Sequence, residues 1–148
     1  MAHTFRNATL VVAALAVILP LAACSSPTTV TATLGEWSIA VDKDSVPAGP
    51  VVFDVTNDGP TDPHEFVIVK TDLAPGDLPV DDTGKVDEEG AGLTFIGEIE
   101  ELEVGANASA TFDLEAGNYV LICNIVDTAD GATEAHYVLG MRLAFTVE

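Results

Sequence analysis

Hydrophobic and polar residues alternate with a period of two over much of the chain. Val51, Phe53 and Val55, for example, alternate with Val52 and Asp54. Such alternation is typical of β-strands that bury one face and expose the other. The pattern predicts at least seven strands, over Val30 to Val41, Val51 to Thr56, Glu65 to Lys70, Leu93 to Leu102, Ala108 to Leu114, Asn118 to Asn124 and Met141 to Val147.

Turn-forming residues separate these segments. Asn57 to Pro60 reads Asn-Asp-Gly-Pro and Glu115 to Asn118 reads Glu-Ala-Gly-Asn, and Gly, Asn and Pro favour tight turns. Asp72 to Gly92 is rich in Pro, Gly and acidic residues, which predicts a long loop. Many short strands with turns between them, and no long amphipathic helix, predict an all-β protein with a Greek-key β-sandwich of seven to eight strands.

The N-terminal segment has the pattern of an export signal. Arg6 precedes an apolar run from Ala13 to Leu19, which is shorter than the roughly 20 residues that a membrane-spanning helix needs. Leu21 to Cys24 reads Leu-Ala-Ala-Cys and resembles the bacterial lipobox, in which the chain is cut before the cysteine and lipid is attached to it. The alternative is an ordinary secretory signal that ends near a cysteine.

The lipobox interpretation divides the chain into three parts. We expect a lipoprotein signal peptide over residues 1–23, a tether over residues 24–30 that begins at the lipid-modified Cys24, and one domain over residues 31–148. The domain would then lie on the extracytoplasmic side of the cell membrane, attached through its lipid anchor only.

Charge restricts the partners of this domain. Beyond the signal segment, four basic residues stand against 24 acidic ones, a formal net charge of −20. This charge excludes nucleic acid as a partner and disfavours direct adhesion to an anionic membrane. A protein with a basic docking face would be attracted, although the acidic residues could equally serve solubility alone.

Cysteine usage indicates a specialised role for one thiol. If Cys24 carries lipid, Cys123 is the only free thiol and no internal disulfide can form. In an oxidising compartment, such a cysteine is either an inert core residue or is protected by a metal.

Four residues with ligand side chains fall where predicted strands begin or end. His64 precedes one strand, Cys123 is near the end of another, and His136 and Met141 flank the segment that leads into the last. Two imidazoles, a thiolate and a thioether favour one copper ion in both the Cu(I) and Cu(II) states, whereas zinc would leave the methionine unexplained. Taken singly, each residue could instead be an ordinary strand-edge, core or packing residue.

The same segments resemble the cupredoxins, the family of plastocyanin and azurin. The resemblance lies in Gly117 to Asn124, in His136 to Met141 with the strand that follows, and in His64 to Val69. It implies a type 1 blue copper site that transports single electrons, with His136 as the ligand nearest solvent. It also implies an apolar contact surface around His136, formed by Ala135, Tyr137, Val138 and Leu139. Twelve residues separate Cys123 from His136, more than in plastocyanin-like or azurin-like members, and we expect them to bulge outward while their ends stay close.

These observations leave three functions open. The first is electron transport to a redox partner, a cytochrome or oxidase by analogy. The second is extracytoplasmic copper sequestration or delivery, and the third is a metal-free binding or sensor domain with the same architecture. We do not expect an enzyme, because only two histidines, His64 and His136, lie beyond the signal segment and no catalytic nucleophile and base are evident.

Overall fold

A computed structural model describes residues 26–129 and 131–148 of the chain. The predicted signal peptide and Cys24 lie outside the described residues. β-Strands account for nearly all regular structure in the described part, which has one four-residue helix. The elements in chain order are β1 (Thr28–Gly35), β2 (Ser38–Val41), β3 (Ser45–Val46), β4 (Gly49–Asn57), β5 (His64–Lys70), β6 (Thr94–Leu102), β7 (Asn107–Leu114), β8 (Gly117–Ile122), β9 (Val126–Ala129), β10 (Ala132–Ala135), α1 (His136–Leu139) and β11 (Arg142–Val147).

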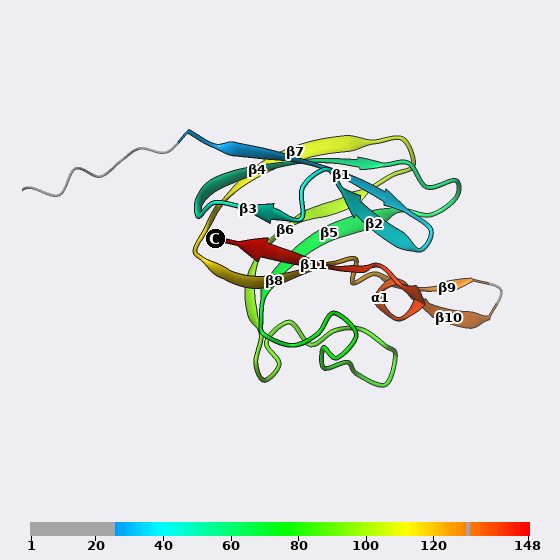
Figure 1. Cartoon of the computed structure of the whole chain (residues 1–148). Coiled ribbons are helices and arrows are strands. Elements are labelled where there is room, and N and C mark those ends of the chain that lie inside the picture. The colour runs from blue at the N-terminus through cyan, green and yellow to red at the C-terminus, as the bar shows by residue number, and fades with distance from the viewer. Residues whose placement is uncertain (1–25, 130) are drawn as a thin grey trace, which may run out of the picture.

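Two main sheets form the layers of a β-sandwich. One sheet has the order β2-β1-β4-β7 and the other has the order β3-β11-β8-β5-β6. Strands β9 and β10 form a separate hairpin, which projects from one end of the sandwich in Figure 1. β1 and β4 pair in parallel, as do β3 and β11, while the other pairs are antiparallel. The prediction of an all-β sandwich is confirmed.

The first predicted strand was wrong in one respect, because the segment from Val30 to Val41 forms two strands. β1 and β2 pair in an antiparallel hairpin, with Glu36 and Trp37 in the turn between them. β1 begins at Thr28 and pairs with β4 from its first residue, so the sheet starts before the predicted domain boundary at residue 31. The other six predicted strands are present, with ends that differ by at most two residues.

The main core lies between the two large sheets. Alternate residues of the strands point into it, as the period of two predicts. Phe53 of β4 is fully buried, and its ring centroid lies 5.1 Å from that of Phe66 and 5.5 Å from that of Phe145. Full burial of one such side chain stabilises the fold by about 1.5–3 kcal/mol. The two sheets are therefore held together by aromatic and aliphatic packing.

Residues 71–93, called the 71–93 loop below, cover the outer face of the five-stranded sheet. Figure 1 shows this loop below the strands β5 and β8. Because of this cover, β5 and β8 are buried on both faces, whereas the alternation predicted one buried face. A second hydrophobic cluster fills the space between sheet and loop, formed by Val67, Val69, Leu78, Val86, Val120, Ile122 and Tyr137.

Hydrogen bonds fasten the 71–93 loop next to Cys123 and His136. The Tyr137 hydroxyl donates to the Pro75 carbonyl at 2.8 Å and accepts from the Leu78 N–H at 3.1 Å. The Asn124 side chain accepts from the Val86 N–H at 2.6 Å and donates to the Val86 carbonyl at 3.0 Å. Tyr137 follows His136 and Asn124 follows Cys123, so the loop braces both.

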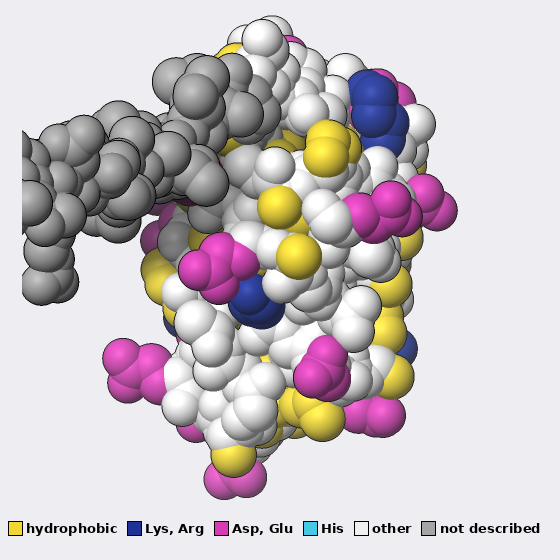
Figure 2. Space-filling model, turned by 60° about the vertical axis from the view of Figure 1, so that its left-hand side comes forward, with side chains coloured by type: hydrophobic (Ala, Val, Ile, Leu, Met, Phe, Trp, Pro, Cys, Tyr) yellow, Lys and Arg dark blue, Asp and Glu magenta, His cyan; other side chains and the backbone are white. Residues whose placement is uncertain are grey.

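The surface is acidic. Acidic residues number 24 against five Lys and Arg in the whole sequence, and Figure 2 shows them scattered over one face rather than gathered in one cluster. No helix of the described residues has the length and apolar character to span a membrane.

Candidate metal centre

Strand pairing brings two of the candidate ligands to one end of the sandwich. β5 and β8 are antiparallel neighbours, so the beginning of β5 lies near the end of β8. His64 is the first residue of β5, and Cys123 directly follows β8. His136 returns to the same place as the first residue of α1, and its N–H donates to the Ile125 carbonyl at 3.0 Å.

His64, Cys123 and His136 form a compact triangle of donor atoms. The two Nδ1 atoms are 3.1 Å apart, and Cys123 Sγ lies 3.4 Å from Nδ1 of His136 and 3.9 Å from Nδ1 of His64. All three residues are fully buried. A point equally distant from the three atoms lies about 2.0 Å from each, close to the bond lengths of about 2.0–2.3 Å for metal–nitrogen and metal–sulfur bonds. The three donors therefore fit a single small metal ion.

Met141 lies beside this triangle. Its side chain is fully buried, its N–H donates to the His136 carbonyl at 3.0 Å, and its carbonyl accepts from the Cys123 N–H at 3.1 Å. These bonds join Met141 to two of the three candidate ligands. The thioether as a fourth ligand stays a prediction.

Burial sets the protonation of the metal-free group. It raises the pKa of the Cys123 thiol to about 12, although the Glu65 N–H, 3.4 Å from the sulfur, opposes the rise. Burial also lowers the pKa of His64, and the nearby His136 lowers it further. At neutral pH the thiol therefore holds its proton while His64 is neutral, so a metal ion must displace the thiol proton to bind.

The turn between β1 and β2 covers the two imidazoles. The Trp37 ring lies edge-on to both, with its centroid 4.8 Å from that of His136 and 6.2 Å from that of His64. Its neighbour Glu36 places Oε1 at 3.9 Å from Nε2 of His64. The turn thus closes the site from the side of the four-stranded sheet.

Glu36 is fixed by the segment that precedes His64. Its Oε1 accepts hydrogen bonds from the backbone N–H groups of Thr61 at 3.0 Å and Asp62 at 2.9 Å. Burial alone would raise the pKa of Glu36, but these two hydrogen bonds and the one from its own N–H lower it overall. Glu36 is therefore a carboxylate at neutral pH.

The long segment between Cys123 and His136 forms the β9–β10 hairpin. Val126 pairs with Ala135 at its base, so its ends are adjacent while its two strands extend away from the sandwich. The outward bulge expected from the sequence is confirmed. Asp127 in β9 places Oδ2 at 3.7 Å from Nε2 of His136.

The four candidate ligands are all fully buried, so it stays a prediction that the ligand nearest solvent is His136. Its side chain is fully buried, because the Trp37 ring and the β9–β10 hairpin lie over it. Tyr137 is also buried, against the 71–93 loop. Only Val138 and Leu139 of the expected apolar surface are largely exposed, at 52% and 44%.

Sequence analysis missed Glu36, Trp37 and Asp127 as parts of the site. The first two were assigned to the interior of one long strand, although Gly35 before them was a signal for a turn. Asp127 is one of many acidic residues, and no pattern in the sequence distinguishes it. Trp37 was identifiable only as the single tryptophan of the chain.

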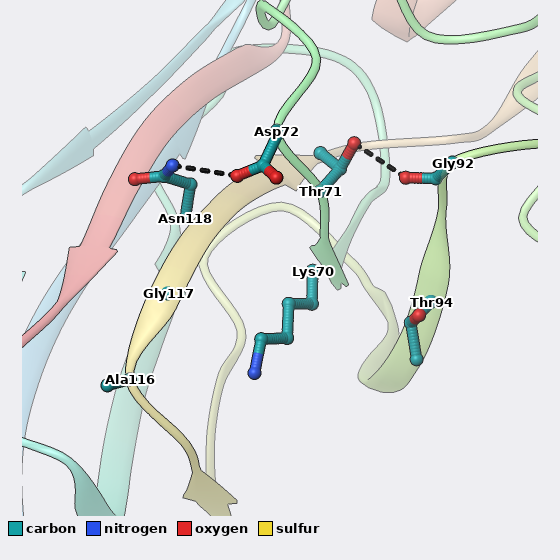
Figure 3. A pocket seen from close by; sticks show the side chains of 8 residues that line it. All are labelled: Lys70, Thr71, Asp72, Gly92, Thr94, Ala116, Gly117 and Asn118. Carbon is teal, nitrogen blue, oxygen red and sulfur yellow. Dashed lines mark hydrogen bonds between the residues drawn. The ribbon is translucent and has the colours of Figure 1, made fainter.

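A surface pocket of about 420 Å³ lies at the opposite ends of β5 and β8 (Figure 3). The Thr71 hydroxyl donates to the Gly92 carbonyl at 2.8 Å, and the Asn118 amide donates to Asp72 at 2.9 Å, across its rim. Lys70 is paired with Glu115 at 3.2 Å. None of the metal-centre residues lines this pocket.

Comparisons with known proteins support the architecture. No family model and no curated protein matches the chain. The reduced auracyanin of Roseiflexus castenholzii is 23% identical, with a TM-score of 0.53 over 84% of this chain and 98% of that one. Auracyanin A of Chloroflexus aurantiacus, described as a "blue" copper protein, is 22% identical, with a TM-score of 0.54 over 83% of this chain and 100% of that one. Rusticyanin of Thiobacillus ferrooxidans is 18% identical, with a TM-score of 0.59 over 84% of this chain and 79% of that one. These likenesses establish the cupredoxin-like fold.

Proposed function

We propose that the protein is an electron carrier with one copper ion, bound by His64, Cys123 and His136 with Met141 as a fourth ligand. The observation that carries the proposal is the buried triangle of two imidazole nitrogens and one thiol, with sides of 3.1, 3.4 and 3.9 Å. A mixture of imidazole, thiolate and thioether donors suits copper in both oxidation states. When bound, copper would supply the one-electron exchange between Cu(I) and Cu(II).

The protein's own contribution is a rigid and dry site. The ligands come from β5, from the end of β8 and from α1, and the backbone of Met141 ties the last two together. The Glu65 N–H is directed at the Cys123 sulfur and would stabilise a thiolate there. Ligands held in this way rearrange little when an electron arrives or leaves.

Because His136 is buried, an electron does not reach the copper site through an exposed ligand. Trp37 contacts His136 and is partly exposed, so its ring links the buried site to the surface. Val138 and Leu139 offer exposed apolar area in α1, directly after His136. We place the docking face here. The acidic surface favours a redox partner with a basic face, a cytochrome or oxidase by analogy.

Copper sequestration or delivery is the second candidate. It requires easy exchange of the ion, whereas all three candidate ligands are fully buried and Trp37 lies against the imidazoles. This enclosure favours the electron carrier.

Two rates separate the candidates. Electron self-exchange is measured by NMR line broadening in mixtures of the Cu(I) and Cu(II) protein, and copper loss is measured with a coloured Cu(I) chelator. Rapid self-exchange with slow copper loss is expected. Slow self-exchange with rapid loss would overturn the carrier function in favour of delivery.

The location is proposed from the sequence alone. Leu21 to Cys24 supports export and lipid attachment at Cys24, which would hold the domain at the extracytoplasmic face of the membrane. Cys24→Ser should move the protein from the membrane fraction to the soluble fraction. A variant that stays in the membrane fraction would contradict the lipid anchor.

A further inference from the structure

We propose that Glu36 and Asp127 are positioning residues, which accept hydrogen bonds from Nε2 of His64 and Nε2 of His136 when the site holds copper. The inference rests on the proposed copper site and adds to it the groups that orient both imidazoles and favour Cu(II) over Cu(I).

Unpaired buried atoms point to these two contacts. Among the described residues, four buried side-chain nitrogen and oxygen atoms have no hydrogen-bond partner, and all four belong to this site. They are Nε2 of His64 with Oε2 of Glu36, and Nε2 of His136 with Oδ1 of Asp127. Buried polar groups are rarely left unpaired, because each carries a desolvation cost. One hydrogen bond from each Nε2 to its neighbouring carboxylate would give both imidazole nitrogens a partner.

The geometry of the triangle determines which nitrogen carries the proton. Both Nδ1 atoms point at the shared centre with the Cys123 sulfur, so each must present a lone pair to a metal there. A neutral imidazole that binds metal through Nδ1 carries its proton on Nε2. Each Nε2–H then needs an acceptor, and the nearest carboxylate oxygens are Oε1 of Glu36, 3.9 Å from His64, and Oδ2 of Asp127, 3.7 Å from His136. A closure of about 1 Å would bring both pairs to hydrogen-bond distance.

Glu36 is held firmly enough to serve this purpose. Thr61 and Asp62 donate to its Oε1, which is also the oxygen 3.9 Å from Nε2 of His64, and Oε2 of the same carboxylate has no hydrogen-bond partner. Gly59 packs directly against the carboxylate, and a Cβ added there would lie 2.8 and 2.9 Å from the two oxygens. The side chain is 13% exposed, so solvent competes little for its free oxygen.

Asp127 gives the β9–β10 hairpin a role in the site. It is the second residue of β9 and lies over His136 from the solvent side. Its cross-strand partner is Glu134 of β10, and no oxygen of Glu134 lies within ion-pair distance of His136. Asp127 is 38% exposed and faces more solvent competition than Glu36.

Both carboxylates favour the same oxidation state of the copper ion, Cu(II). A carboxylate that accepts from Nε2–H makes the imidazole a stronger donor and adds negative charge near the metal, which favours Cu(II). Loss of such a partner typically lowers metal affinity 10–100-fold. A tenfold loss confined to Cu(II) corresponds to a rise of about 59 mV in the reduction potential.

The experiment compares Asp127→Asn and Glu36→Gln in the copper-loaded full-length protein. The matched controls are Glu134→Gln, which removes the same charge from the paired hairpin position, and Asp58→Asn in the exposed turn before His64. Cu(II) and Cu(I) affinities are measured by chelator competition and the reduction potential by redox titration.

We expect both test variants to bind Cu(II) at least tenfold more weakly with Cu(I) affinity unchanged, and therefore to have a potential at least about 59 mV higher, with little change in the controls. Test variants that match their controls, in a protein that binds copper, would overturn this inference alone. Wild-type protein that binds no copper would overturn the proposed function as well. If Glu36→Gln disturbs folding through Thr61 and Asp62, Asp127→Asn decides the outcome.

Discussion

Tyr137 fastens the 71–93 loop to the outer face of the five-stranded sheet, and Tyr137→Phe removes this connection without changing the packing of the ring. The lost hydroxyl bonds the Pro75 carbonyl and the Leu78 N–H. Each hydrogen bond contributes about 1 kcal/mol, and Leu78 is buried, so its N–H loses its partner in a poorly hydrated place. We expect the free energy of unfolding to fall by about 2–3 kcal/mol.

Urea denaturation of the metal-free protein measures this loss, and Tyr119→Phe is the matched control. The Tyr119 side chain is buried like that of Tyr137, but its hydroxyl makes one hydrogen bond instead of two, to the Glu115 carbonyl at 2.7 Å. The control should therefore cost about 1 kcal/mol or less. Amide exchange at Leu78 should accelerate in Tyr137→Phe only. A Tyr137→Phe variant no less stable than Tyr119→Phe would refute the anchoring of the loop by this hydroxyl.

Three further predictions follow from the same structure. Met141→Leu should keep copper bound but raise the reduction potential, because the thioether is replaced by an apolar group of similar size; an unchanged potential in redox titration would argue against Met141 as a ligand. Burial raises the pKa of Cys123 to about 12, so the folded metal-free chain keeps a proton that the unfolded chain loses near pH 9. Stability should therefore fall as pH rises from about 9 toward 12, by at most ~1.4 kcal/mol per pH unit, and denaturation of Cys123→Ala should lack this component. Gly59→Ala should destabilise the fold by about 1–3 kcal/mol by displacing Glu36, whereas Gly76→Ala, whose nearest neighbour would lie 3.9 Å away, should cost little on thermal denaturation.

The strands and the ligand triangle could be predicted because the sequence encodes them locally. Alternation marks the buried faces of strands such as β4 and β7, and Gly117 and Asn118 mark the place where the chain turns into β8. His64, Cys123 and His136 fall at strand ends, and antiparallel pairing of β5 with β8 brings two of them together. Their predicted proximity is confirmed by the distances.

The residues that bury the metal centre could not be predicted from local sequence patterns. Trp37 and Glu36 reach it only because β1 and β2 fold back on each other, and the alternation of residues within each strand does not specify this pairing. Burial of His136 depends on the β9–β10 hairpin, whose mostly polar and small residues carry no strong strand signal. Burial of both faces of β5 depends on the 71–93 loop, which lies next to β5 in the chain but covers it only through tertiary packing.

The most direct test of the central claim is a titration of the protein with Cu(II), followed by optical and EPR spectroscopy and then by reduction with ascorbate. We predict one copper ion per chain and an intense visible band from the Cys123 thiolate that disappears on reduction and is missing from Cys123→Ser. No such band in the wild-type protein, or an equally intense band in Cys123→Ser, would contradict the proposed copper site.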